Sequence, residues 1–395
     1  MRLIANWWLS IDYVTFIIML TLMAVGLLLI TAASPAMSER IGTPSFYFIH
    51  KQIQFMLIAL PCMIIPTLMG EKALRTLSFI SLFIIILLLC LLPFFGDVTK
   101  GAKRWISVAG FSLQPSEFLK PFYGVVIAKI LTTSKSKNFI NFASEIDKMN
   151  KNGNERFFIA SILHMLIIGL LLMQPDFGMT VTVSVVTGIQ FFLAGLPIHF
   201  IIIMLTILCI GFWGAYIALP HVTKRIDLFM HGSNEHCYQV HKSLESYARG
   251  GFWGTGPGEG ALKYMLPDSH TDFIFATAGE ELGIVFCLIV LALLAFLVLR
   301  CITQIANLKS QYDICVAISS ITYIAFQSLF NIGVTLHLFP TKGMTLPFIS
   351  YGGSSLIALS LAMGIYLQIT RKSRLRTRSK SDLIIFGPKI SAIYH

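Results

Sequence analysis

The sequence has few charged residues for its length. Only 12% of its 395 residues are charged, against about 25% in soluble domains. Hydrophobic residues make up 55% of the chain. A chain of this size with so little charge cannot cover a water-soluble globule with polar surface, so that class is excluded. The composition indicates a polytopic membrane protein built from helices in lipid.

Three kinds of sequence pattern are also absent, and each absence argues against a class of site. The seven cysteines show no paired spacing, which argues against a disulfide framework or a zinc site. The glycine-rich stretch 250–260 lacks a Gly-Lys-Ser/Thr ending, so it is neither a P-loop nor a dinucleotide fingerprint, and it is either a hinge or a weak phosphate contact. No basic–aromatic pattern indicates nucleic-acid binding. The net charge of +11 therefore points to anionic lipid or a phosphate-bearing substrate.

What the sequence does contain is a series of long apolar segments. They predict ten membrane spans, and the first is too long for a signal peptide. The segments are 13–33, 53–69, 77–95, 117–132, 157–173, 178–196, 199–219, 273–299, 314–337 and 348–369.

The distribution of lysine and arginine predicts the orientation. The loop 129–156 and the tail 371–395 are rich in both residues, which places them in the cytoplasm together with the N-terminus. The outer face then holds the stretches 96–116, 220–272 and 338–347. We expect one transmembrane domain over 1–370, with a large periplasmic loop at about 220–272. The basic tail should be a disordered segment attracted to anionic lipid.

The most unusual stretch is Leu266-Pro267-Asp268-Ser269-His270-Thr271-Asp272-Phe273, which leads into an apolar run. Pro267 disfavours a helix before it, and Ser269 or Thr271 can cap the helix that follows. Asp272 is then expected in the first helical turn, at the mouth of the bundle. A carboxylate there indicates a functional site, with a simple complement to the helix dipole as the alternative.

Two other outer stretches carry polar chemistry. Glu117 and Lys120 are three residues apart inside a span, so they can pair on one helix face as a structural lock or as part of a polar cavity. The stretch 339–355 has prolines and glycines at a membrane entry, and its hydroxyls and amides suit sugar or phosphate. A histidine group at 231, 236 and 241 lies in an expected loop, and its spacing does not favour a metal site.

Several of these motifs together resemble the SEDS family, the FtsW/RodA/SpoVE proteins of bacterial cell-wall synthesis. The resemblance covers nearly the whole chain and is strongest to the division branch, FtsW. The motifs are Arg104-Trp105-Ile106, Gln114-Pro115-Ser116-Glu117, Gln174-Pro175-Asp176, the stretch Leu266–Ala276, and Ile349-Ser350-Tyr351-Gly352-Gly353-Ser354-Ser355.

This resemblance implies an all-α, ten-helix peptidoglycan glycosyltransferase. It would polymerise lipid II at the division site of the cytoplasmic (inner) membrane, beside a class B penicillin-binding protein (an FtsI-like transpeptidase) and other divisome proteins. Asp272 takes the place of the family's essential aspartate. No cofactor is required by the sequence, although a divalent cation could assist. The expected substrate-binding residues are Arg104, Trp105, Glu117, Lys120, Arg249, His270, Thr271, Lys342, Ser350, Gly353 and Ser354.

Two other functions remain open from the sequence. A lipid II flippase should show a polar path across the whole membrane. Here the unusual polar residues crowd the outer half, and the spans 77–95 and 178–196 carry no charge, which favours an outward-facing enzyme. A divisome scaffold would not require Asp272, so one substitution separates it from catalysis.

Overall fold

The computed structural model describes residues 7–99, 102–108, 111–132, 155–196, 236–340 and 343–386, together with isolated positions between 202 and 227. In this part of the chain, seven helices are long and apolar enough to cross a membrane, α14 through its portion Gly353–Ser373. They are α2 (Tyr13–Ile41), α3 (Tyr47–Leu68), α4 (Glu71–Phe95), α7 (Glu155–Met173), α12 (Ile274–Ile305), α13 (Gln311–Thr335) and α14 (Gly353–Phe386).

Shorter elements complete the described chain. The remaining helices are α5 (Leu119–Thr132), α8 (Phe177–Leu193), α11 (His236–Gly250) and the 3-10 turns η1 (Pro115–Phe118) and η3 (Leu262–Tyr264). Only isolated positions of the expected span 199–219 are among the described residues. The predicted class, a helical polytopic membrane protein, is confirmed.

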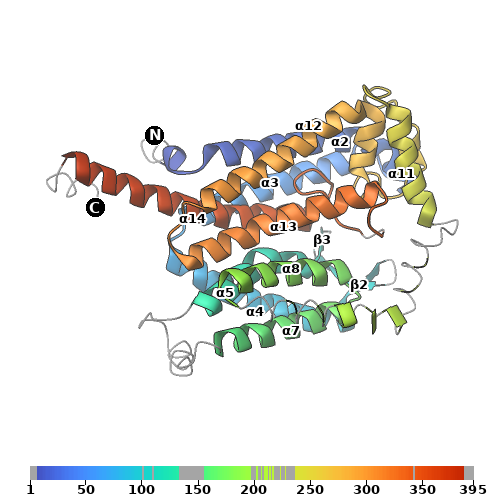
Figure 1. Ribbon diagram of the computed structural model, residues 1–395. Coiled ribbons are helices and arrows are strands. Elements are labelled where there is room, and N and C mark those ends of the chain that lie inside the picture. Colours follow the sequence, from blue (N-terminus) through green and yellow to red (C-terminus); the bar gives the residue numbers. More distant parts are fainter. Residues whose placement is uncertain are drawn as a thin grey trace.

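The helices form two packed groups (Figure 1). One hydrophobic core is built from α2, α3, α12, α13 and α14, and the other from α4, α5, α7 and α8. Helix α13 joins the groups, because it packs against α5 and α8 as well as against α12 and α14. The join is close: a Cβ on Gly124 would lie 2.3 Å from the Ser319 hydroxyl oxygen. Gln190 crosses the same join, donating to the carbonyls of Gly124 (2.8 Å) and Cys315 (3.1 Å).

Side-chain caps explain where some helices begin and end. The Asp176 carboxylate accepts the Met179 amide at the start of α8, and Ser310 accepts the Asp313 amide at the start of α13. At the other end of a helix, Gly42 has a left-handed φ of 67° after α2, which is the usual geometry of a C-terminal glycine. These caps satisfy backbone groups that the helices leave unpaired.

The outer stretch 96–116 contains a small antiparallel sheet that the sequence analysis did not predict. Its strands β1 (Asp97–Thr99), β2 (Ala102–Val108) and β3 (Phe111–Leu113) pair in chain order. Short strands give only a few alternating positions, so their pattern is weak beside that of the flanking helices.

The first and last described segments meet at one end of the bundle. The Arg371 guanidinium donates to the Ser10 hydroxyl (2.7 Å) and to the Thr67 carbonyl (2.5 Å). Helix α14 continues past these contacts to Phe386 and projects beyond the bundle (Figure 1). The expectation of a disordered tail from residue 371 is therefore wrong as far as Phe386, because the membrane helix continues without a break.

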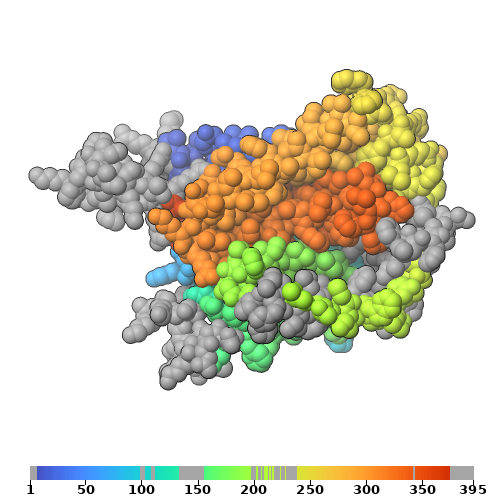
Figure 2. Space-filling view, in the orientation of Figure 1, coloured from blue at the N-terminus to red at the C-terminus, as the bar shows by residue number. Residues whose placement is uncertain are grey.

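The opposite end carries α11 and the glycine-rich loop after it. In the space-filling view their yellow surface forms the end of the molecule away from the start of α2 (Figure 2). The loop expected around His236 and His241 is a helix from His236 onward. Among the described residues, no three His, Cys, Asp or Glu side chains gather as a metal site would require.

Candidate functional site

Asp272 lies in the turn that leads into α12, where it is half-buried. Helix α12 begins at Ile274, and its N-cap Phe273 has no side-chain cap. The prediction that Asp272 stands in the first helical turn is wrong by two residues. The predicted caps are also wrong, because the Thr271 hydroxyl donates to the Asp268 carbonyl (3.2 Å) and Ser269 offers its carbonyl to Thr277.

The turn that carries Asp272 is tied to the loop before α14. The Ser350 hydroxyl donates to the Thr271 carbonyl (2.6 Å) and accepts the Leu346 amide (2.8 Å). The Tyr351 amide donates to the His270 carbonyl (3.0 Å). Ser350 thus bonds to both loops, so its observed role is to hold them together.

Each loop contains one residue in the left-handed region. The φ angles are 57° at Asp268 and 65° at Phe348. Asp tolerates this conformation, whereas a bulky phenylalanine adopts it rarely. Such strain persists only where surrounding contacts over-determine the backbone, and it concentrates at functional sites.

Asn331 links the same two loops from α13. Its amide nitrogen donates to the carbonyls of Asp272 (2.9 Å) and Met344 (2.6 Å). Gly343 lies against the Asp272 carboxylate, where an added Cβ would be 2.9 Å from Oδ2. The position of Asp272 is therefore set from α13 and from the loop 343–351. We call Thr271, Asp272, Asn331, Gly343 and Ser350 the Asp272 cluster.

The predicted Glu117–Lys120 pair is confirmed and extends further. Lys120 Nζ lies 2.5 Å from Glu117 Oε2 and 2.9 Å from Gln327 Oε1. The Gln327 amide donates in turn to the Thr345 carbonyl (2.9 Å) and hydroxyl (3.0 Å) and to the Ser355 hydroxyl (3.4 Å). We call these five residues the Lys120 cluster. It adjoins the Asp272 cluster, because Gln327 and Asn331 are one turn apart on α13.

Burial limits what Lys120 can do in this conformation. Its side chain is only 1% exposed and that of Glu117 is 12% exposed. Both acceptors near the ammonium belong to the protein. Lys120 therefore acts here as a support for Gln327 and the loop 343–351, and the half-buried Glu117 is the more accessible partner.

Arg104 on β2 supports a different part of this end of the bundle. Its guanidinium donates to the carbonyls of Gln174 (2.9 Å) and Pro175. Directly after Pro175, Asp176 Oδ2 accepts hydrogen bonds from Gln114 (3.4 Å) and from Ser116 (3.3 Å).

Ser354 connects this region to α14, since its hydroxyl accepts the Gln114 amide (3.1 Å). Ser116 lies in η1 and bonds to Asp176.

The other predicted site residues are less closely joined. Trp105 is half-buried on β2 opposite Asp97. Arg249 is 47% exposed, 3.7 Å from Glu280 Oε1. Gly353 serves packing, because a Cβ there would meet the Phe55 ring at 2.4 Å. Lys342 lies outside the described residues.

His270 lies between two aromatic rings. It is 4% exposed, with centroid distances of 4.4 Å to Phe48 and 5.3 Å to Tyr351. Burial raises the pKa of Tyr351 to about 12, so this phenol stays protonated at neutral pH. Neutral Tyr351 is not a base, and the carboxylates of this loop pair are those of Asp268 and Asp272, both half-buried.

Sequence reasoning missed the two amides that join the clusters. Gln327 and Asn331 are four residues apart in the apolar helix α13, so they face the same side. Two amides on one face of a membrane span are costly unless they are bonded, and that signal was present in the sequence. Together, the clusters bring a carboxylate, an ammonium and several amides and hydroxyls to one end of the bundle. Such a set can accept a proton and bind a polyhydroxylated substrate.

Comparison with known proteins agrees with this arrangement. The profile of the FtsW/RodA/SpoVE family, described as cell cycle protein, matches residues 12–375. A protein of Caulobacter vibrioides called "Probable peptidoglycan glycosyltransferase FtsW" is 35% identical over 367 residues, covering 93% of this chain and 90% of the relative. The "Stage V sporulation protein E" of Bacillus subtilis is 36% identical over 377 residues, covering 92% of this chain and 98% of the relative.

Solved structures show the same fold. A chain from a study of polymerization and crosslinking by a peptidoglycan synthase complex superposes with a TM-score of 0.73 at 23% identity, covering 93% of this chain and 99% of that one. The rod shape determining protein RodA of Thermus thermophilus superposes with a TM-score of 0.66 at 22% identity, covering 93% and 98%. At this identity the likeness concerns the fold alone. With a profile match over nearly the whole length, the chain belongs to the FtsW/RodA/SpoVE family of cell cycle proteins.

Proposed function

We propose that this chain is a peptidoglycan glycosyltransferase that polymerises lipid II into glycan strands, with Asp272 as the general base. The observation that carries the proposal is the placement of the Asp272 carboxylate beside Gly343, in a turn fixed by Asn331 and Ser350. Relatives of this chain are called peptidoglycan glycosyltransferases, which supports the reaction class.

The proposed reaction is a displacement at the anomeric carbon of the donor sugar. Asp272 takes the proton of the acceptor 4-hydroxyl, while the oxygen of that hydroxyl forms the new glycosidic bond with the anomeric carbon. The bond from the anomeric carbon to the phosphate oxygen breaks, and undecaprenyl pyrophosphate leaves with the electron pair. Positive charge must stabilise this leaving group. Half-buried Lys103 and Arg104 and the exposed Arg249 are candidate cations among the described residues, with Lys342 as a further candidate.

The Lys120 cluster has a supporting role in this proposal. Lys120 holds Gln327, and Gln327 holds Thr345 two residues from Gly343. Preorganised groups of this kind keep a reacting carboxylate in position, and a misplacement of about 1 Å can lower the rate about a hundredfold. The carrier's apolar tail explains a site at the membrane edge.

The cellular setting follows from the same relatives. We propose that the protein works in the bacterial inner membrane at the division site, with a class B penicillin-binding protein that crosslinks the strands. Relatives called FtsW and a fold shared with a chain from a peptidoglycan synthase complex support this setting.

The direct test is polymerisation by the purified protein. Lipid II would be supplied in detergent or liposomes, with and without the penicillin-binding partner, and glycan strands resolved on a gel. We expect strands from the wild-type protein, with more in the presence of the partner. A folded protein that forms the complex but yields no strands would contradict the proposal.

A further inference from the structure

Helix α12 is broken at Gly283, where φ is 78° and ψ is 176°. A break leaves backbone groups without helical partners. Here the glycine-rich loop supplies them. Four backbone hydrogen bonds join the loop to the break: Thr255 N to Glu280 O (2.9 Å), Gly256 N to Glu281 O (3.0 Å), Ile284 N to Gly251 O (2.9 Å) and Val285 N to Phe252 O (3.3 Å).

The approach of loop and helix requires glycine on both sides. A Cβ on Gly283 would lie 2.4 Å from Gly254 N, and a Cβ on Gly254 would lie 2.2 Å from Glu281 O. Both residues also have φ values that favour glycine. The loop is therefore a fixed part of the broken helix, rather than the hinge that its composition suggested.

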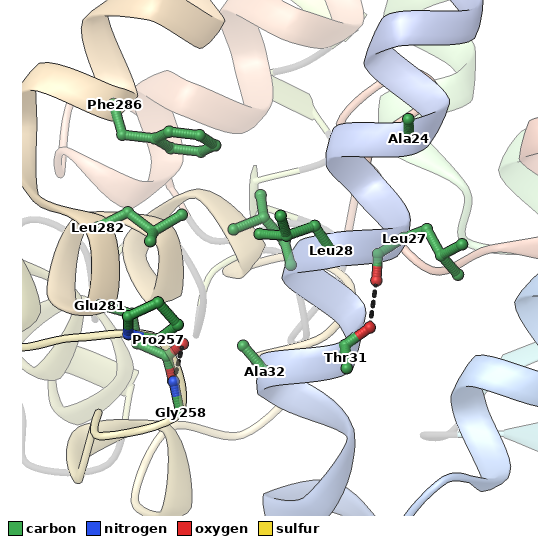
Figure 3. Close-up of a pocket in the computed structure, with 11 residues that line it drawn as sticks. Ala24, Leu27, Leu28, Thr31, Ala32, Pro257, Gly258, Glu281, Leu282 and Phe286 are labelled. Carbon is green, nitrogen blue, oxygen red and sulfur yellow. Dashed lines mark hydrogen bonds between the residues drawn. The ribbon is translucent and has the colours of Figure 1, made fainter.

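Two adjacent buried carboxylates of α12 hold the rest of this loop. Glu280, which is fully buried, accepts the amides of Ala261 (2.8 Å) and Leu262 (2.9 Å) on one oxygen. Glu281 accepts Lys263 Nζ (2.6 Å) and the Gly258 amide (2.9 Å). Figure 3 shows Glu281 beside Pro257 and Gly258, at one end of a groove of about 660 Å³ between α2 and α12.

The segment after Leu262 runs directly to Asp272. Leu266 donates its amide to the Leu262 carbonyl (2.8 Å) and packs with Phe273 and Ala276. The segment 262–272 is thus held by Glu280 at its start and by the first turn of α12 at its end. Hydrogen bonds to a carboxylate are stronger than those between neutral groups, and no water competes at a fully buried site.

We infer that Glu280 is a positioning residue for Asp272: its carboxylate anchors the amides of Ala261 and Leu262 and so fixes the segment that carries the base. This inference rests on the proposed function. It also gives the glycine-rich loop a role, since the loop and the break place Glu280 where it can hold that segment.

The test compares Glu280→Ala and Glu280→Gln in the full-length protein with its penicillin-binding partner. For Glu280→Ala we expect kcat for lipid II polymerisation to fall about a hundredfold, with KM unchanged. Glu280→Gln keeps an acceptor oxygen and should lose less. Hydrogen exchange of residues 258–272 should rise in the same order, which links the loss to this segment.

The matched control is Glu245→Gln on α11. Glu245 pairs with Lys242 at 2.6 Å with its side chain 43% exposed, so neither kcat nor exchange of 258–272 should change. If Glu280→Ala does not fold, Glu280→Gln is the test, and we expect it to lower kcat and to raise hydrogen exchange of residues 258–272 by smaller amounts.

A folded Glu280 variant with faster exchange in 258–272 and wild-type kcat would overturn the inference, as would a change in KM alone. Asp272→Asn is assayed beside it. Full activity of Asp272→Asn would refute the general base, and so the proposed function, independently of the Glu280 result.

Discussion

Two buried lysine–glutamate pairs in the described part of the chain differ in what they hold. Lys120 and Glu117 are 2.5 Å apart within one turn, and Glu117 keeps 12% of its side chain exposed. Lys263 and Glu281 are 2.6 Å apart, come from segments 18 residues apart, and are 2% and 1% exposed. The first pair branches through Gln327 toward the Asp272 cluster, whereas the second closes the glycine-rich loop on the broken helix. The comparison suggests that the first serves the site and the second serves the fold around it.

Removing the charge of the more enclosed lysine should have the larger effect on stability. Lys263→Met leaves the Glu281 carboxylate buried without its cation, which should cost about 3–5 kcal/mol. Thermal unfolding in detergent, with size-exclusion chromatography as the readout, measures this loss of stability. Lys242→Met is the control, because Lys242 makes a comparable pair at the surface and should leave the unfolding temperature unchanged.

Lys120→Met should affect activity more than folding, because the partially exposed Glu117 can be hydrated when its cation is lost. We expect polymerisation to be lost, and Lys120→Arg to retain only part of it, since a planar guanidinium does not replace a compact ammonium. The double variant Glu117→Gln/Lys120→Met decides the role. If it recovers activity, the pair is only a structural lock.

Gly343→Ala tests the site without touching either pair. The added Cβ would lie 2.9 Å from Asp272 Oδ2, so the carboxylate must move. We expect a loss of roughly tenfold to a hundredfold in kcat with little change in stability. Gly169→Ala on α7 is the control, because nothing lies within 4 Å of its added Cβ.

The orientation of both pairs can be tested with the smallest perturbation. On a background without native cysteines, a cysteine at Trp253, which is 82% exposed, should react with an impermeant thiol reagent added to spheroplasts. A cysteine at Ser379 should react only after lysis. The reverse pattern would place both pairs on the cytoplasmic side, where lipid II polymerisation has no use.

Local patterns predicted one pair and missed the other. The Glu117–Lys120 spacing fixes a shared helix face, so the sequence alone indicates the contact. Lys263 and Glu281 are 18 residues apart in sequence, and their contact lies beside the break of α12 at Gly283. Tertiary contacts with the glycine-rich loop determine that break, and periodicity carries no signal for them.

In the candidate site, too, the sequence predicted some features and missed others. The resemblance and the polar run made Asp272 the candidate base, which stays a prediction. They did not predict its place before α12, because the N-cap Phe273 carries none of the residues that usually mark a helix start. The prolines and glycines of the stretch 339–355 predict irregular backbone at a membrane entry. The bonds of this stretch to Thr271 and Asp272 through Ser350 and Asn331 depend on packing between distant segments, so the sequence could not supply them.

The most direct measurement of the central claim is lipid II polymerisation by Asp272→Asn beside Asp268→Asn. Both carboxylates lie in the same turn, but the Asp268 carbonyl serves that turn by accepting the amides of Thr271 (3.0 Å) and Phe273 (3.2 Å), which its Asn variant keeps. We predict no strands from Asp272→Asn, although it still folds and binds its partner, and substantial strands from Asp268→Asn. Near-normal strands from Asp272→Asn would contradict the assignment of Asp272 as the general base.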